Sequence, residues 1–206
     1  MFGGGILDIA IEFYIAISAS LIVGFVFLGM SYGYTQKRAN QRYAKGKDKA
    51  PSLNSFRILS KVLFVSSMLV TIVSYWFAWP FLLLIYSSYF ATAIGAVLVL
   101  VGYCGLRQSF VKLGNNYSPL FDAFIPFELV TKGIYSRIRH PIYLFNLFVS
   151  FGLALSSGSA LVFFNGAIGL CFILWTIHIE ENYLRQRFSH YSLYCDRTWR
   201  LVPYCF

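Results

Sequence analysis

Long apolar runs separated by polar segments fill most of the chain. The runs lie at residues 6–34, 62–79, 81–104, 142–157 and 159–179. Their lengths are of the order of the ~20 residues that a helix needs to cross the apolar core of a bilayer. This pattern predicts an all-α, polytopic integral membrane protein with about five transmembrane helices, one for each run.

Both ends of the chain add to this prediction. The first run is longer than the apolar core of a signal peptide, and no Lys or Arg precedes Lys37, so we interpret it as a transmembrane helix. After the fifth run, a stripe at helical spacing consists of Glu180, Leu184, Phe188, Tyr191 and Cys195. We therefore expect a C-terminal cytoplasmic helix.

The polar segments differ in length on the two sides of the predicted membrane. The turns at 76–80 and 156–159 are short, whereas the segments 35–61, 105–141 and 180–206 are long. With five spans, the three long segments lie on the same side. We expect any chemistry to take place on that side.

Composition and charge support the membrane class and orient it. Hydrophobic residues make up 58% of the chain and charged residues 12%, which is atypical of soluble domains. If the N-terminus lies outside, all 17 Lys and Arg fall on the side of the long segments, which the positive-inside rule makes cytoplasmic. We therefore attribute the net charge of +9 to topology and to contact with membrane lipids rather than to nucleic acid.

Cysteine and histidine provide no sign of a metal centre. The four cysteines form no CxxC pair, and their spacing to the three histidines does not match a metal-binding pattern. We predict free thiols and no metal site.

The dipeptide His140-Pro141 marks a helix start. A residue before proline avoids the helical region, and proline is favoured at the first helical position. The N–H groups of Ile142, Tyr143 and Leu144 are then expected to be free, and with Arg139 and His140 they would form an anion site. The alternative is that Arg139, like Arg137, only extends toward lipid headgroups.

Two adjacent carboxylates leave the fifth run. Glu181 has Arg185 four residues on, which predicts a surface ion pair. Glu180 has no basic neighbour at helical spacing, so we predict it as the functional member of the pair. With Tyr135, Tyr143, Tyr191 and Tyr194, these groups describe a pocket for a zwitterion with an additional cation, such as a sulfonium.

The residues of the second half resemble the isoprenylcysteine carboxyl methyltransferase family and its relatives, the phospholipid N-methyltransferases. The resemblance covers residues 105–206. Its motif positions are Leu129, Val130, Thr131, Gly133, Tyr135, Arg139, His140, Pro141 and Tyr143, then Glu180, Glu181, Leu184, Phe188, Tyr191, Tyr194, Arg200 and Pro203.

The resemblance implies an integral-membrane enzyme that transfers a methyl group from S-adenosylmethionine. It implies a pocket open to the cytoplasm and a lipophilic acceptor that enters from the bilayer. Arg139 and Glu180 are the predicted catalytic residues, Arg139 by orienting an anion. The predicted cofactor contacts are Leu129, Val130, Tyr135, His140, Pro141, Ile142, Tyr143 and Glu180.

The resemblance also divides the chain into two regions. Residues 1–104 form a three-span membrane region with the basic loop 35–61. Residues 105–206 form a methyltransferase-like core with the cofactor pocket, two spans and the C-terminal helix. The expected location is a bacterial inner membrane or the endoplasmic reticulum, with the N-terminus outside.

The acceptor is less well defined. An isoprenylcysteine carboxylate or a small prenyl-like thiol or acid is one option, and a phospholipid amine is the alternative. Members that act on prenylated cysteine carry His and Arg where this chain has Phe127 and Thr176, which weakens the first option. The oligomeric state stays open.

Two further classes compete with the methyltransferase. Val202, Pro203 and Tyr204 match the end of membrane sterol reductases, which use NADPH, but Arg139 to Tyr143 and the glutamate pair do not fit that group. The other rival is an inactive membrane adaptor, against which the intact Tyr135, His140 and Glu180 argue.

Overall fold

The computed structural model describes residues 3–43, 54–77, 85, 88–117 and 128–204. These residues form the helices α1 (Gly3–Tyr43), α2 (Asn54–Trp76), α3 (Tyr89–Leu113), α4 (Pro141–Ser157), α5 (Ala160–Arg187) and α6 (Tyr191–Cys195). Two short 3-10 turns, η2 (Gly114–Asn116) and η3 (Gly133–Ser136), follow α3 and precede α4. No β-strand occurs in the described ranges, which confirms the predicted all-α class.

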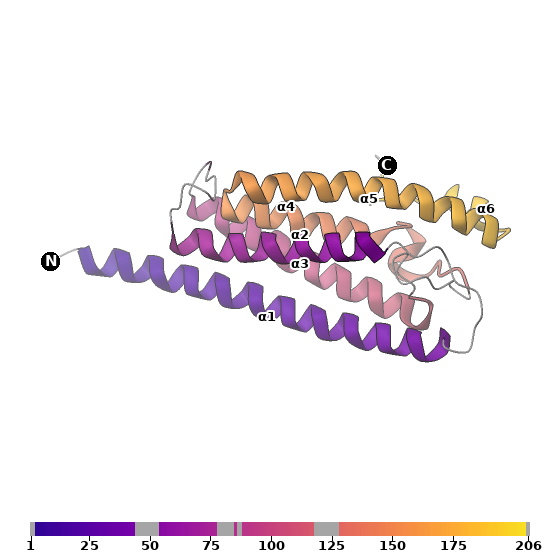
Figure 1. The fold of residues 1–206 in the computed structure, drawn as a ribbon, viewed down its shortest axis with the longest axis horizontal. Coiled ribbons are helices and arrows are strands. Elements are labelled where there is room, and N and C mark those ends of the chain that lie inside the picture. The colour runs from indigo at the N-terminus through magenta and orange to yellow at the C-terminus, as the bar shows by residue number, and fades with distance from the viewer. Residues whose placement is uncertain (1–2, 44–53, 78–84, 86–87, 118–127, 205–206) are drawn as a thin grey trace.

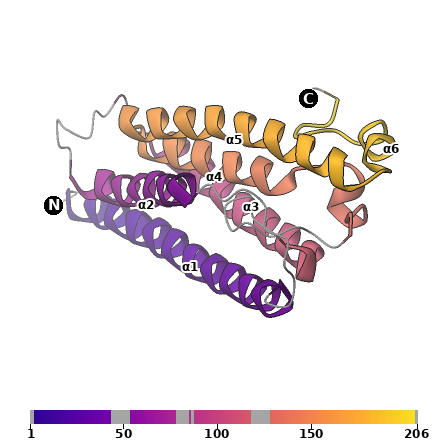
Figure 2. The same ribbon diagram turned by 45° about the vertical axis from the view of Figure 1, so that its right-hand side comes forward.

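The long helices form one elongated bundle. In two views, α4 lies between α3 and α5, and α1 lies on the side away from α5 (Figures 1 and 2). The end of α1, the start of α4 and helix α6 gather at the same end of the bundle (Figure 1). We call this the site end, because the long polar segments meet there.

Three of the described helices are long and apolar enough to cross a membrane. They are Ile11–Thr35 within α1, Tyr89–Leu113 (α3) and Ala160–Arg187 (α5). Lys61–Trp76 within α2 and Pro141–Ser157 (α4) are shorter apolar helices. The structure therefore shows three helices of spanning length, and the count of five spans stays a prediction.

The predicted stripe from Glu180 to Cys195 does not lie on one helix. Helix α5 ends at Arg187, and Phe188 has extended backbone angles (φ −118°, ψ 110°). The chain then forms α6, a single short helix of five residues. The C-terminal segment is therefore a turn back toward α4 rather than a long helix.

Helices α3 and α4 pack backbone against backbone. A Cβ atom added to Gly95 would lie 2.5 Å from the carbonyl oxygen of Gly152, and one added to Gly152 would lie 2.7 Å from that of Gly95. One added to Gly102 would lie 2.6 Å from Val149 Cγ2. Small residues thus allow the two helices to approach closely. In membranes such close packing stabilises a helix pair, because no hydrophobic driving force acts between helices.

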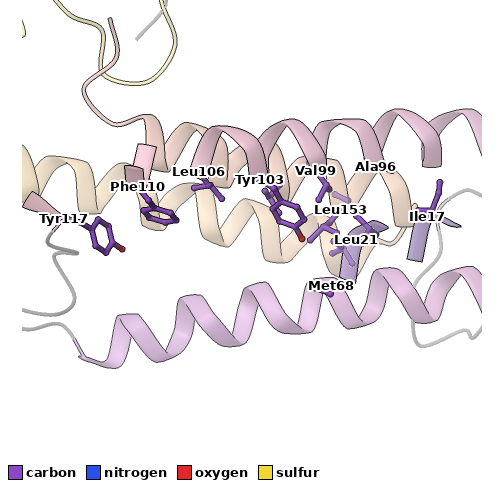
Figure 3. Close-up of a cluster of buried hydrophobic side chains, with 13 residues drawn as sticks. Ile17, Leu21, Met68, Ala96, Val99, Tyr103, Leu106, Phe110, Tyr117 and Leu153 are labelled. Atoms are coloured by element: carbon purple, nitrogen blue, oxygen red, sulfur yellow. The ribbon is translucent and has the colours of Figure 1, made fainter. Parts of the chain in front are cut away.

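A row of buried side chains along α3 forms the centre of the apolar core. Figure 3 shows this row, and its labelled members on α3 are Ala96, Val99, Tyr103, Leu106 and Phe110. The row packs against Leu21 of α1, Met68 of α2 and Leu153 of α4. The core therefore joins the first helices of the chain to α4, at whose start lie the predicted site residues Arg139, His140 and Pro141.

Candidate functional site

The C-terminal tail holds the segment before α4 through its backbone. Ile138 and Trp199 form a parallel bridge. The N–H of Trp199 donates to the Arg137 carbonyl at 2.9 Å, and the N–H of Arg139 donates to the Trp199 carbonyl at 2.8 Å. The N–H of His140 donates to the Arg200 carbonyl at 3.0 Å. The tail therefore fixes the start of α4 from a distance of about sixty residues along the chain.

Helix α4 begins at Pro141, as the sequence predicts, with His140 as the residue before it. The predicted set of free N–H groups is wrong in part. The N–H groups of Tyr143 and Leu144 both donate to the His140 carbonyl, at 3.1 and 3.2 Å. Because a tight first turn uses these two donors, only Ile142 of the three has no backbone hydrogen bond among the described residues.

Arg139 is engaged within the protein. Its Nε donates to Glu181 Oε1 at 2.9 Å, and its terminal nitrogen donates to the carbonyls of Cys195 (3.0 Å) and Thr198. The predicted role of Arg139, to orient an anion of the cofactor or acceptor, stays a prediction, and these bonds describe a structural role. The guanidinium joins α4, α5 and the tail.

The prediction for Glu181 is also wrong. Its side chain is only 3% exposed, and it accepts from Arg139 Nε and, at 3.1 Å, from Arg200 Nε. Arg185, its expected surface partner, instead points its guanidinium at Cys195 Sγ. Spacing along α5 identified Arg185 as a possible neighbour of Glu181, but its partners are Arg139, before α4, and Arg200, in the tail. Glu181 is the buried centre of a charge network.

His140 lies between the two carboxylates. Its Nδ1 is 3.6 Å from Glu180 Oε2, and its Nε2 is 3.4 Å from Glu181 Oε1, with the imidazole only 4% exposed. The ring stacks on Tyr143, with centroids 5.6 Å apart. Helix α4 thus places the imidazole at the contact between its own first turn and the end of α5.

A cavity of about 610 Å³ extends from this cluster into the bundle. Every residue predicted for the site lines it: Leu129, Val130, Tyr135, Arg139, His140, Pro141, Ile142, Tyr143 and Glu180. The stripe residues Leu184, Phe188 and Tyr191 line it as well. The structure therefore brings the two distant motifs to one chamber, whose volume lies in the usual range for small-molecule sites.

The cavity wall carries buried polar atoms that form no hydrogen bond within the described part of the protein. Within the described residues, seven buried side-chain N or O atoms have no hydrogen bond, and five of them belong to cavity residues: Asn116 Oδ1, Tyr135 OH, His140 Nε2, Glu180 Oε2 and Tyr191 OH. Buried polar groups are normally paired, so this concentration marks a place where a ligand or water completes the bonding.

The tyrosines and Glu180 have complementary electrostatics. Burial raises the pKa of the Tyr135 and Tyr191 hydroxyls above the ordinary value, so both remain neutral hydrogen-bond donors. The negative charge of Glu180 adds to the increase in the pKa of Tyr135. A carboxylate among aromatic rings attracts a cation, whereas neutral hydroxyls bind uncharged polar groups.

Sequence reasoning missed the polar residues of the wall outside the motifs. Asn116 donates to Glu128 Oε1 at 2.9 Å beside the site end. Asn146, Ser150 and Asn165 line the cavity deeper in the bundle. Polar side chains inside apolar runs are the signal that could have identified the last three.

The two departures from the family pattern have different outcomes. Phe127 lies outside the described residues. Thr176 is buried in the cavity wall, and its hydroxyl donates to the Phe172 carbonyl at 2.8 Å. The position where relatives carry an arginine therefore holds a neutral, internally bonded side chain.

Together these features define a helical protein with helices of membrane-spanning length and a cavity that extends from the site end into the bundle. Residues 90–191 match the model of the family described as phospholipid methyltransferase. The protein-S-isoprenylcysteine O-methyltransferase of Dictyostelium discoideum is 28% identical over 159 residues, which cover 74% of this chain and 65% of that relative. The chain thus spans slightly less than two thirds of the relative's length. Both matches support the similarity to phospholipid and isoprenylcysteine methyltransferases that the motifs indicated.

Proposed function

We propose that the protein is a membrane methyltransferase that binds S-adenosylmethionine in the cavity and methylates a lipophilic acceptor. The observation that carries this proposal is the Glu180 carboxylate, whose Oε2 lies 3.6 Å from His140 Nδ1 and forms no hydrogen bond, in a wall that also holds the Tyr135 and Tyr191 hydroxyls. Both matches support the reaction class.

The residues present fit this cofactor. Glu180 would attract its positive charge, with the ring of Tyr143 beside the carboxylate. Tyr135, Tyr191 and the N–H of Ile142 would donate to its polar groups, and Leu129 and Val130 would cover its apolar parts. The network of Arg139, Glu181 and Arg200 would hold this wall in position rather than contact the ligand.

When bound, S-adenosylmethionine would supply a methyl group on a cationic sulfur. A lone pair of the acceptor would form a bond to the methyl carbon, and the bond between this carbon and the sulfur would break, with its electron pair staying on the sulfur. A carboxylate acceptor would become a neutral ester, and an amine would become an alkylammonium ion. The leaving group is already activated, so the protein's task is to orient the acceptor and exclude water. The mainly apolar cavity suits that task.

The acceptor enters from the bilayer in this proposal. The names of the two matches suggest two acceptor classes, a phospholipid and an isoprenylcysteine. Both carry hydrocarbon chains, which would lie along the apolar lining formed by Phe25, Leu28 and Phe64. Membrane lipids would surround the exposed apolar faces of the helices.

We also propose a five-span topology with the N-terminus outside and the cavity open to the cytoplasm. Lys61, Lys112, Lys132, Arg185 and Arg197 belong to segments of the site end, which supports this orientation by the positive-inside rule. A bacterial inner membrane or the endoplasmic reticulum would satisfy the proposal.

Titration of the purified protein in detergent tests the cofactor. We expect saturable binding of S-adenosylmethionine, which Glu180→Gln weakens at least tenfold because one hydrogen-bonded or paired charge contributes about 1.5–3 kcal/mol. Asp196→Asn, which changes an exposed carboxylate outside the cavity lining, is the matched control. Binding of NADPH alone would favour the reductase class, and binding of neither would favour an adaptor.

A further inference from the structure

The cavity continues far beyond the motif residues. Along α5 its lining includes Asn165, Gly169, Ile173, Thr176 and Glu180, which recur at helical spacing on one face. The fifteen residues from Asn165 to Glu180 correspond to about 22 Å along a helix. The cavity therefore has a deep part inside the bundle, which the residues of the recognised motifs do not line.

Two asparagines of this deep part differ in their bonding. The Asn165 amide donates to Ser66 Oγ at 3.3 Å and Ser67 Oγ at 3.1 Å, so it fastens α5 to α2. The half-buried Asn146 side chain also lines the cavity, and no hydrogen bond joins it to another described residue. Its amide can therefore bond to a ligand or water in the cavity.

Most charged side chains of the lining lie around the motif residues. Apart from tyrosines, its ionisable lining residues in the described chain are Lys61 in the first half of α2, Glu128 between η2 and η3, Arg139 and His140 directly before α4, and Glu180 in the last third of α5. One turn after Asn146 on α4 the lining holds Ser150, and α5 contributes the apolar Phe172 and Ile173 to the same lining. An ionised group would lack a counter-charge there, so the environment suits a neutral polar group.

We propose that Asn146 is a specificity-determining residue that hydrogen-bonds a neutral polar group within the chain of the acceptor. The assignment rests on the proposed function. Asn146 lies six residues after His140 on α4, which places it about 9 Å deeper along the helix. The favoured acceptor carries a carbonyl or hydroxyl below its reacting end, rather than a purely hydrocarbon chain.

Two kinds of lipid could supply this group, and paired probes separate them. Diacyl phosphatidylethanolamine has ester carbonyls that its dialkyl ether analogue lacks, and farnesol has a hydroxyl that farnesene lacks. We would measure binding of each probe by native mass spectrometry in detergent. The variants are Asn146→Leu, the matched control Asn182→Leu on the exposed surface of α5, and Gly169→Leu. A Cβ atom added to Gly169 meets no atom within 4 Å, so a leucine there would begin in open space and extend into the cavity.

The expected result is that the wild type binds the polar member of one pair about tenfold more tightly, as one hydrogen bond allows. Asn146→Leu should abolish this preference, and Asn182→Leu should retain it. Gly169→Leu should weaken binding of both members. The pair that shows the preference identifies the source of the group. If Asn146→Leu does not fold, Asn146→Ala provides the same comparison.

An unchanged preference in the Asn146 variant, or no preference in either pair, would overturn the assignment. Binding of S-adenosylmethionine is measured in parallel and should be equal in wild type and Asn146→Leu. A wild type that shows the lipid preference but does not bind S-adenosylmethionine would contradict the proposed function and leave the assignment of Asn146 standing.

Discussion

Two neighbouring carboxylates on α5 face different surroundings. Successive residues of a helix point about 100° apart, so Glu181 faces the start of α4 and the tail while Glu180 faces the cavity. Glu181 is 3% exposed and Glu180 is 25% exposed. The first carboxylate is fully used by two arginines, and the second keeps an oxygen for a ligand.

Neutralising Glu181 should therefore affect stability before it affects binding. Glu181→Gln leaves Arg139 and Arg200 without their counter-charge, and the loss of one partner of a buried pair costs about 3 kcal/mol. We expect the melting temperature in detergent to fall by several degrees. Glu180→Gln, measured beside it, should melt close to the wild type. Equal melting temperatures for both variants would refute this division of roles.

Tyr135 provides a second test at the residue scale. Its hydroxyl is buried in the cavity wall and has no partner among the described residues, so Tyr135→Phe removes no bond within the protein. We expect unchanged thermal stability and three- to tenfold weaker binding of S-adenosylmethionine, for a bond of about 1 kcal/mol. Burial raises the pKa of this hydroxyl, so the difference should not change between pH 6 and roughly pH 9. Equal affinity in the two proteins would exclude a contact with Tyr135.

At the scale of elements, the contact between α3 and α4 depends on missing side chains. Gly95→Ala would bring a Cβ to 2.5 Å from the backbone of Gly152 and Ser156, and neither backbone can rotate away. We expect a loss of stability of about 1–3 kcal/mol, measured as thermal unfolding. Gly33→Ala, where nothing lies within 4 Å, should be neutral or slightly stabilising. A stable Gly95→Ala variant would mean that the helices do not pack this closely.

The same elements show why only part of the site follows from the sequence. The start of α4 at Pro141 was predictable, because proline chemistry acts locally. The partners of Glu181 were not, because Arg139 lies 42 residues away and Arg200 is placed by the folding back of the tail. The end of α5 at Arg187 was equally hidden, since the helical spacing of the apolar residues continues across the break.

For the whole molecule, the apolar runs and the charge distribution predict the orientation in the membrane. Starting from a protein without its native cysteines, Trp76→Cys and Thr131→Cys place exposed thiols at opposite ends of the bundle. An impermeant maleimide should label the first in intact cells and the second only after the membrane is opened. The reverse pattern would invert the proposed topology.

The central claim is that the whole molecule transfers a methyl group to a lipid-soluble acceptor. The most direct measurement incubates membranes that contain the protein with S-adenosylmethionine radiolabelled in its methyl group and counts the label extracted into organic solvent. We predict label above that of membranes without the protein, and its loss in Glu180→Gln. If membranes in which the protein binds S-adenosylmethionine transfer no label to any extractable product, the account is contradicted.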